Sequence, residues 1–499
     1  MKKRLTAILL LFALCVGMFS ACGKGKKDSG DDANSAGDGI VVDQTGKDAH
    51  ARYDVSGKVT IAINKNRSTD FKALLDSFSK VYKNIELKID YFDTEGGSPE
   101  YLTAKVASGS LPDVVFDDYA PMPFYITQGW VYPLNDFVKD DPDFEYVPKP
   151  IVDSYTYNDR LYALPDAVHF QTIFLNNDLM NEMNLAHPKL DWTIDEYAAL
   201  LKAATNEKYS GTETLFDLDR NLSGIMNEDY TLLSYNYATR KFNMVDTWAP
   251  AVKFMRDLRV VPGLEAWSLR WNNASDGKSD YVKKFSEGDV DDTYMAFKMG
   301  KTLSDTLRGT WDAWLYELKF EWELWPFPQA NGMKGRFPMH VDHSFMTTGV
   351  TEENADAAFQ VLRYITYSTE GNITRLSMFD EKNKGKYALN NKYYIPATNH
   401  PDVTEKFKSL PEVTEAIIYM YDNMPTSFRA DPNKIVPNFD KIHDDIILKS
   451  RNQVTDGLAE APAVAADLQK KANDEMDKSW SEFDTALKKT ESEFDAKFK

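Results

Sequence analysis

The stretch KVTIAINKNRSTDFKALLDSFSKVYKNIELKIDYF, residues 58–92, decides the fold class. It opens with a β-branched run at 58–63, continues with apolar residues at helical spacing, and ends at 85–92 in an alternating segment typical of a strand. A second helical pattern near 99–108 and the apolar run LPDVVF at 111–116 follow. Strand, helix, strand, helix and strand in this order predict an α/β fold with a parallel sheet covered by helices.

The loops that follow these three strands are the first place to look for a binding site. Ligands of open α/β sheets bind at the carboxyl ends of the strands. Asn66 and Arg67 follow the first strand and could bind hydroxyl or carboxylate groups, whereas Asp117 and Asp118 follow the third. A solvated loop or turn explains each pair equally well from the sequence alone.

The amino-terminal segment predicts secretion and a lipid anchor. Three basic residues at 2–4 precede an apolar run at 5–19, which is too short to cross a bilayer and is typical of a signal peptide. The run ends in FSAC, residues 19–22, which resembles the lipobox of bacterial lipoproteins, with Phe in place of the usual Leu. We therefore expect cleavage after residue 21 and diacylglycerol on Cys22. Because the other cysteine, Cys15, lies in the signal peptide, we expect no disulfide in the mature chain.

Composition narrows the range of partners. Residues 1–21 hold three of the 58 Lys and Arg, so the mature chain has 55 of them against 77 Asp and Glu, a net charge of −22. Such a surface repels phosphate backbones and excludes nucleic acid as a partner. Residues 22–56 are rich in Gly, Lys, Asp and Ser and predict a flexible tether at the membrane surface.

Several longer segments resemble one family. They are ASGSLPDVVFDDYAPMPFYITQGWVYPLNDFV, NDRLYALPDAVHFQTIFLNNDLMNEMNL, DWTIDEYAALLKAA, YMAFKMGKTLSDTLRGTW, WELWPFPQANG, NADAAFQVLRYITYSTEGN and VTDGLAEAPAVAADLQKKANDEMDK. Their order and spacing resemble those of extracellular solute-binding proteins of family 1, the capture subunits of ABC importers, whose best-known member is the maltose-binding protein. The resemblance covers about 57–480.

The resemblance implies a two-lobe, type II periplasmic-binding-protein-like fold with the ligand in a cleft between the lobes. Carried onto this chain, the crossing segments fall near 163–166, 341–349 and 389–398. The implied N-terminal lobe comprises 57–164 and 345–388, and the implied C-terminal lobe comprises 166–342 and 395–499. The tail after residue 479 extends past the family pattern, and its spaced aromatic residues predict an amphipathic helix that packs against its own lobe.

The resemblance also points to ligand-binding residues. Trp311 matches the family's ligand-stacking tryptophan, with a tryptophan of the lobe core as the alternative. The first crossing contributes Asp166, His169 and Phe170, and the second contributes Asp342 and His343. Aromatic faces cover sugar rings, and carboxylates and amides accept hydrogen bonds from sugar hydroxyl groups. Trp267 and Trp271 are four residues apart and could share a helical face, although a buried pair is the preferred interpretation.

The sequence leaves two further interpretations open, a metal site and an enzyme. Asp217, Asp219, Asn221 and Glu228 occupy EF-hand spacing, but Leu222 stands where the calcium loop needs Gly, so we expect no metal and keep calcium only as a weak candidate. No nucleotide-binding or nucleophile motif is present, and we expect no cofactor. A secreted glycoside-active enzyme with two carboxylates stays open as the alternative of a different class.

Together these observations predict a monomeric, lipid-anchored solute-binding protein on the outer face of a bacterial cell membrane. We expect it to capture a carbohydrate, in particular an oligosaccharide, by lobe closure and to deliver it to the permease of an ABC importer without catalysing a reaction. A peptide or a cationic solute on the same fold is the alternative cargo.

Overall fold

The computed structural model describes residues 51–65, 68–92, 97–117, 121–271, 279–285, 296–310, 318–380 and 394–498. The predicted signal peptide, lipidation site and most of the tether lie outside these residues. Within them, no helix is long and apolar enough to span a bilayer.

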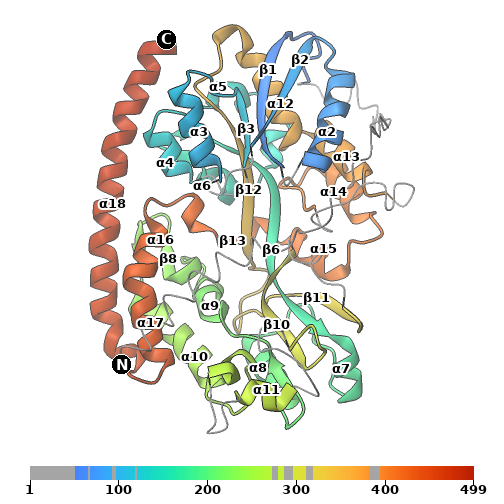
Figure 1. Ribbon diagram of the computed structural model, residues 1–499, viewed down its shortest axis with the longest axis vertical. Coiled ribbons are helices and arrows are strands. Elements are labelled where there is room, and N and C mark those ends of the chain that lie inside the picture. Colours follow the sequence, from blue (N-terminus) through green and yellow to red (C-terminus); the bar gives the residue numbers. More distant parts are fainter. Residues whose placement is uncertain are drawn as a thin grey trace, which may run out of the picture. The chain divides into compact units, whose positions relative to one another are not determined.

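A nine-stranded sheet forms the centre of the fold (Figure 1), with strand order β2-β1-β3-β12-β6-β10-β7, β11 added on β6 and β13 added on β12. The strands are β1 Gly57–Asn64, β2 Ile85–Phe92, β3 Val114–Asp117, β6 Leu164–Asn176, β7 Ser210–Thr212, β10 Thr302–Gly309, β11 Trp322–Pro326, β12 Pro338–Met346 and β13 Phe428–Arg429. β1 pairs in parallel with both β2 and β3, which confirms the predicted parallel arrangement. Two short hairpins, β4–β5 (Thr156–Tyr157 and Arg160–Leu161) and β8–β9 (Tyr235–Asn236 and Lys241–Phe242), lie outside this sheet.

Helices surround the sheet at both of its ends. Around β1, β2 and β3, the first lobe, lie α2 Ser68–Val81, α3 Gly97–Ala107, α4 Met122–Thr127, α5 Asn135–Val138, α12 Ala355–Ile365 and α13 Thr369–Ser377. Around β7, β10 and β11, the second lobe, lie α7 Asn177–Glu182, α8 Ile194–Ala204, α9 Leu218–Met226, α10 Ala249–Arg259 and α11 Asp280–Phe285. The remaining helices are α6 Lys149–Ser154, α14 Pro401–Lys408, α15 Glu415–Asp422, α16 Phe439–Ile442, α17 Leu448–Thr455 and α18 Ala461–Phe498.

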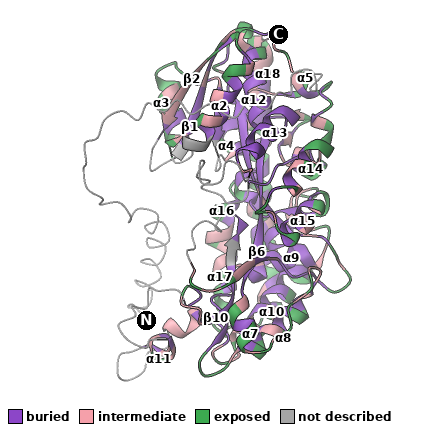
Figure 2. Cartoon of the chain, turned by 90° about the vertical axis from the view of Figure 1, so that its right-hand side faces the viewer, coloured by how far each residue is buried: buried purple, intermediate pink, exposed green. Residues whose placement is uncertain are grey.

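The apolar faces of these helices form the core. In α2 the buried residues Phe71, Leu74, Leu75 and Phe78 recur at helical spacing, and Phe71 lies 3.8 Å from Phe116 of β3 between ring centroids. Burial of such side chains contributes about 1.5–3 kcal/mol each. Figure 2 shows the buried residues in purple along β6 and the inner helix faces, with exposed residues confined to the outer surfaces.

The start of α8 follows the rules of helix capping. The Thr193 hydroxyl accepts a hydrogen bond from the Glu196 amide, and the Glu196 carboxylate accepts one from the Thr193 amide. Trp192, before the cap, packs edge-on against Tyr197 at 5.2 Å, as a hydrophobic staple does. This reciprocal cap fixes where α8 begins.

Two strands run between the lobes. β6 is 13 residues long and buried throughout, and its first half pairs with β12 whereas its second half pairs with β10 and β11. β12 pairs with β3 at its end and with β13 at its start. The third predicted crossing is described from residue 394, where the Val168 amide donates to the Ile395 carbonyl at 2.9 Å. All three crossing segments therefore lie beside one another.

The carboxyl-terminal helix differs from the prediction. The predicted family helix and the extra tail helix form one continuous helix of 38 residues, α18. The tail was predicted to pack against its own, second lobe. That prediction is confirmed for Trp480, which bonds to Tyr235, and is wrong for Phe494 and Phe498, which contact Tyr132 beside the first lobe.

Candidate functional site

Five of the predicted ligand-binding residues lie where β6 and β12 cross between the lobes. Asp166, His169 and Phe170 are on β6, and Asp342 and His343 are on β12. The antiparallel register sets His169 opposite His340 and Ala167 opposite Asp342, so Asp342 is the diagonal neighbour of His169 on one face. The strand pairing therefore brings the two predicted groups together.

Asp342 is the centre of a buried polar cluster. Its carboxylate lies 3.1 Å from Nε2 of His169 and 3.2 Å from Nζ of Lys434. Lys434 also donates to the Val341 carbonyl at 3.1 Å and lies 3.3 Å from the Asp431 carboxylate. Burial opposes the charge on Lys434, but attraction to Asp342 and Asp431 outweighs it and raises the pKa of Lys434 above its ordinary value.

A second cation completes this cluster from β13. Arg429 donates from Nε to Asp431 at 2.7 Å, and its guanidinium lies 4.9 Å from the ring of Tyr155. Burial favours the neutral form of Asp431, yet Arg429 and Lys434 together lower the pKa of that carboxyl below its usual range. Two cations therefore balance two carboxylates, which is the condition under which buried charges are tolerated.

For the two histidines of β12, burial has the larger effect on the pKa and keeps the rings neutral. Burial lowers the pKa of His340 to about 4 and that of His343 to about 3. Nδ1 of His343 lies 3.1 Å from the hydroxyl of Tyr155, whereas its Nε2 is buried without a hydrogen-bond partner. At neutral pH both rings at the crossing are therefore uncharged.

Asp166 occupies a bulge in β6. The register with β12 shifts between Asp342 and His343, and Asp166 is the extra residue on the opposite strand. Its Oδ1 accepts a hydrogen bond from Arg375 of α13 at 2.8 Å, and Arg375 stacks 3.6 Å from the Tyr394 ring. The bulge thus aims Asp166 toward α13 and the third crossing.

The structure brings other residues to the crossing that sequence reasoning missed. Lys434 and Asp342 are 92 residues apart, and Arg375 and Asp166 are 209 apart. Arg429, Asp431 and Lys434 form the short stretch RADPNK, which has no local pattern that predicts burial. The only basis for predicting them was a physical rule: a carboxylate that is buried in the fold needs a cation as its partner.

Trp267 lies apart from this cluster, in the 3-10 helix Trp267–Trp271. It is half-buried and stacks against the Arg270 guanidinium at 4.4 Å. The prediction that Trp267 and Trp271 share a helical face used α-helical spacing, but in a 3-10 helix residues three apart align instead. The side chain of Trp271 lies outside the described residues.

Other predicted ligand residues also lie outside the described residues. They are Asn66, Arg67, Asp118 and Trp311, together with the side chain of Asp117, whose backbone ends β3.

The weak calcium candidate does not fit the structure. Residues 218–226 form the helix α9 rather than a binding loop, and the Asp219 carboxylate accepts two hydrogen bonds from the buried Arg451 at 2.7 and 2.8 Å. Asp217 pairs with Arg220 at 2.9 Å. In the part of the chain that the structure describes, no group of three or more His, Cys, Asp or Glu is arranged to hold a metal ion.

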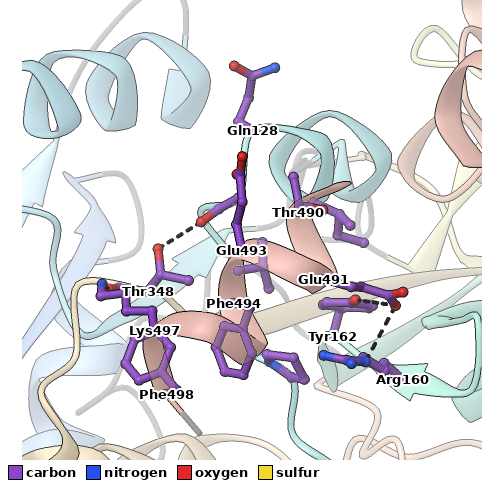
Figure 3. A pocket seen from close by; sticks show the side chains of 14 residues that line it. Gln128, Arg160, Tyr162, Thr348, Thr490, Glu491, Glu493, Phe494, Lys497 and Phe498 are labelled. Carbon is purple, nitrogen blue, oxygen red and sulfur yellow. Dashed lines mark hydrogen bonds and ion pairs between the residues drawn. The ribbon is translucent and has the colours of Figure 1, made fainter. Parts of the chain in front are cut away.

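A separate cavity of about 220 Å³ lies under the end of α18 (Figure 3). Arg160, Tyr162, Thr348, Glu491 and Phe494 are among the residues that line it, and none of the predicted ligand-binding residues does. It is therefore distinct from the crossing.

The sequence from 64 to 367 matches the family model of the bacterial extracellular solute-binding proteins. The chain belongs to this family. The match includes β6 and β12, so the crossing lies inside the family's own region.

Solved structures agree on the fold. The sugar-binding protein MalE from Xanthomonas citri matches with a TM-score of 0.63 at 14% identity, covering 86% of this chain and 99% of that one. An ABC substrate-binding protein from Listeria monocytogenes in complex with cycloalternan gives 0.59 at 14% identity, covering 85% and 99%. The maltose/maltodextrin-binding domain MalE from Bdellovibrio bacteriovorus bound to maltotriose gives 0.54 at 15% identity, covering 84% and 100%. The two-lobe, periplasmic-binding-protein-like α/β fold expected from the sequence is confirmed.

Proposed function

We propose that this extracellular solute-binding protein captures an oligosaccharide between its lobes and delivers it to the permease of an ABC importer. The observation that carries the proposal is the polar cluster at the crossing, where Asp342 and His169 lie together between two lobes of the family's fold. A carboxylate accepts hydrogen bonds from sugar hydroxyls, and an imidazole can donate or accept. The proteins of similar fold named above, with their sugar, maltotriose and cycloalternan, support this choice of cargo.

Access to this cluster requires the lobes to move. Asp342 is 6% exposed and His169 is 3% exposed, so a solute could not contact either of them extensively in the described conformation. Opening about the crossing strands would expose them, and a solute that contacts both lobes would then favour closure. Trp267 and the predicted residues of the loops after β1 and β3, with Trp311, are our further candidates for the cleft walls.

The charges at the crossing argue against a cationic cargo. Asp166 pairs with Arg375, Asp342 with Lys434, and Asp431 with Arg429. A polyamine or other cationic solute would need carboxylates whose charge is not already balanced. The same pairing ties up the carboxylates that a glycoside-cleaving enzyme would use at this place, so we propose binding without catalysis.

The proposed attachment to the outer face of the membrane is through lipid on Cys22. The first described residues are held on the first lobe, where Arg52 pairs with Asp356 at 2.9 Å and the Tyr53 hydroxyl donates to Glu370 at 3.3 Å. A tether ending here would hold the monomer by its first lobe. Mass spectrometry of the membrane fraction is expected to find diacylglycerol on Cys22, and release of a Cys22→Ser variant into the medium is the expected control; an unmodified Cys22 contradicts this anchor.

A thermal-shift panel tests the cargo. We expect maltotriose or maltose to raise the melting temperature, because a ligand at 100 times its Kd stabilises the fold by about 2.7 kcal/mol. A rise with spermidine or a tripeptide instead, or no rise with any sugar, overturns the carbohydrate proposal. Cleavage of the sugar during the incubation would overturn the proposal that the chain is not an enzyme.

A paired substitution tests the site. Trp267→Ala should remove the sugar-dependent shift, whereas Trp325→Ala, which removes a half-buried tryptophan packed edge-on against His187 in the second lobe, should keep it. Equal loss in both variants would contradict a binding role for Trp267.

A further inference from the structure

α18 makes contacts with both lobes. It runs along the left side of Figure 1, from its start near α17 in the second lobe to its end beside the first lobe. We expect the crossing strands to act as the hinge between the lobes. A single helix attached to both lobes should therefore affect how far the lobes can rotate.

The first half of α18 is fixed firmly to the second lobe. Nε1 of the buried Trp480 donates to the Tyr235 hydroxyl at 2.9 Å, and the Arg240 guanidinium stacks on the same indole at 3.8 Å. The Asn473 side chain accepts from the Phe242 amide at 2.7 Å. Buried aromatic contacts and bonds to the backbone hold this half in one position.

The last three turns are attached to the first lobe mainly by partly exposed contacts. The exception is Glu491, which is 7% exposed and accepts hydrogen bonds from the Asn158 side chain at 2.6 Å and the Tyr162 hydroxyl at 3.0 Å. Arg160 pairs with Asp495 at 2.8 Å, and the rings of Phe494 and Phe498 lie 4.8 and 5.2 Å from that of Tyr132. Lys497 donates to the Thr348 carbonyl at 3.2 Å. Figure 3 shows the cavity of about 220 Å³ beneath these turns, so packing here is incomplete.

Rotation of the lobes must disturb this second attachment. From Trp480 to Phe494 the helix extends about 21 Å, so a relative rotation of about 10° would shift its last turns by about 4 Å. Such a shift exceeds the reach of the hydrogen bonds and ion pairs that hold the end. Release of this end would break the bonds of Glu491 and the partly exposed contacts, whereas release at the Trp480 end would also open the aromatic core.

We propose that the last three turns of α18 are a strap that docks on the first lobe and restricts the opening and closing of the cleft. The strap proposal rests on the proposed function in one respect: the motion that the strap restricts is rotation of the lobes. It narrows the range of lobe orientations in the absence of solute, and its release accompanies a change of orientation.

The test measures the spread of distances between the lobes without any ligand. The full chain with Cys15→Ser and Cys22→Ser has no other cysteine, so spin labels can be placed at Lys83→Cys on the first lobe and Ala203→Cys on the second, both exposed. Phe494→Asp places a charge against Tyr132, and Ser492→Asp places the same charge on the exposed side of the same turn. We expect the distance distribution from pulsed electron spin resonance to widen at least twofold for Phe494→Asp and to stay unchanged for Ser492→Asp.

A second variant guards against a folding artefact. Arg160→Ala removes the ion pairs to Asp495 and Glu491 from the lobe side, leaves the helix sequence intact and should widen the distribution in the same way. Equal widths in all three variants and the parent overturn the strap. Because no solute is added, this result is independent of the thermal-shift panel: a widened distribution with no sugar response leaves the strap standing and refutes the cargo, and the reverse pattern does the opposite.

Discussion

Two of the places where the lobes are joined use the same kinds of side chain in opposite settings. At the crossing, Lys434 and Asp431 are 5% and 3% exposed, and at the strap Arg160 and Asp495 are 23% and 34% exposed. Charges that are removed from water are stable only when they are paired with opposite charges, whereas partly exposed charges keep some of their hydration and are screened by salt. The comparison shows how one fold can combine a crossing whose charge pairs are held firmly with an attachment that can release.

The largest effect is expected at the crossing. Lys434→Met removes the cation that Asp342 and Asp431 share and leaves both carboxylates buried, so it should lower the free energy of unfolding by about 3–5 kcal/mol. Lys441→Met, which removes an exposed cation paired with Glu475 at 3.3 Å, should cost less than about 1 kcal/mol. Urea denaturation of the two variants measures the difference, and equal losses would remove the distinction between the two settings.

The pH dependence sharpens the same distinction. His343 is neutral in the fold because burial lowers its pKa to about 3, whereas the unfolded chain binds the proton near its ordinary value of 6.5. Stability from this group is therefore complete above pH 6.5 and falls as pH decreases toward 3, by about 1.4 kcal/mol per pH unit.

His343→Asn serves as the control for this titration. It removes the group and should flatten the decline in melting temperature between pH 6.5 and 4, although His340 and His443 will still contribute because burial lowers the pKa of each to about 4. An unchanged slope in the variant would mean that His343 is already protonated, or solvated, in the fold.

The smallest effect is expected at the strap. Asp495→Asn, which leaves Arg160 beside Glu491, should lower the free energy of unfolding by about 1 kcal/mol or less, and added salt should reduce that difference because a partly exposed pair is screened. Denaturation at low and at high ionic strength measures this. A loss as large as that of Lys434→Met, insensitive to salt, would show that the strap is as fixed as the crossing.

Sequence reasoning reached the parts of the fold that depend on local pattern. The alternating segment at 85–92 and the helical spacing in α2 were sufficient to predict a parallel sheet. No helix-breaking residue stands between Ala463 and Phe498, which explains why the two helices expected there are one. Which lobe the helix would reach depended on its direction in the fold, which the local pattern does not contain.

The crossing shows the corresponding limit for the site. Asp342 and His169 were predicted from the family resemblance, but their cations come from β13, the turn after it and α13. Those partners are chosen by the tertiary structure, since any of the 58 Lys and Arg could have filled the role. The family resemblance therefore indicated where the cluster lies, but the sequence did not show which cations balance its carboxylates.

Solution scattering with and without solute tests the central claim, that two lobes close on a captured sugar. The measurement uses the sugar that raises the melting temperature most, at a concentration that saturates the shift. The account predicts a smaller radius of gyration in the saturated protein and no change in the Trp267→Ala variant. A radius that stays the same at saturation would contradict capture by lobe closure.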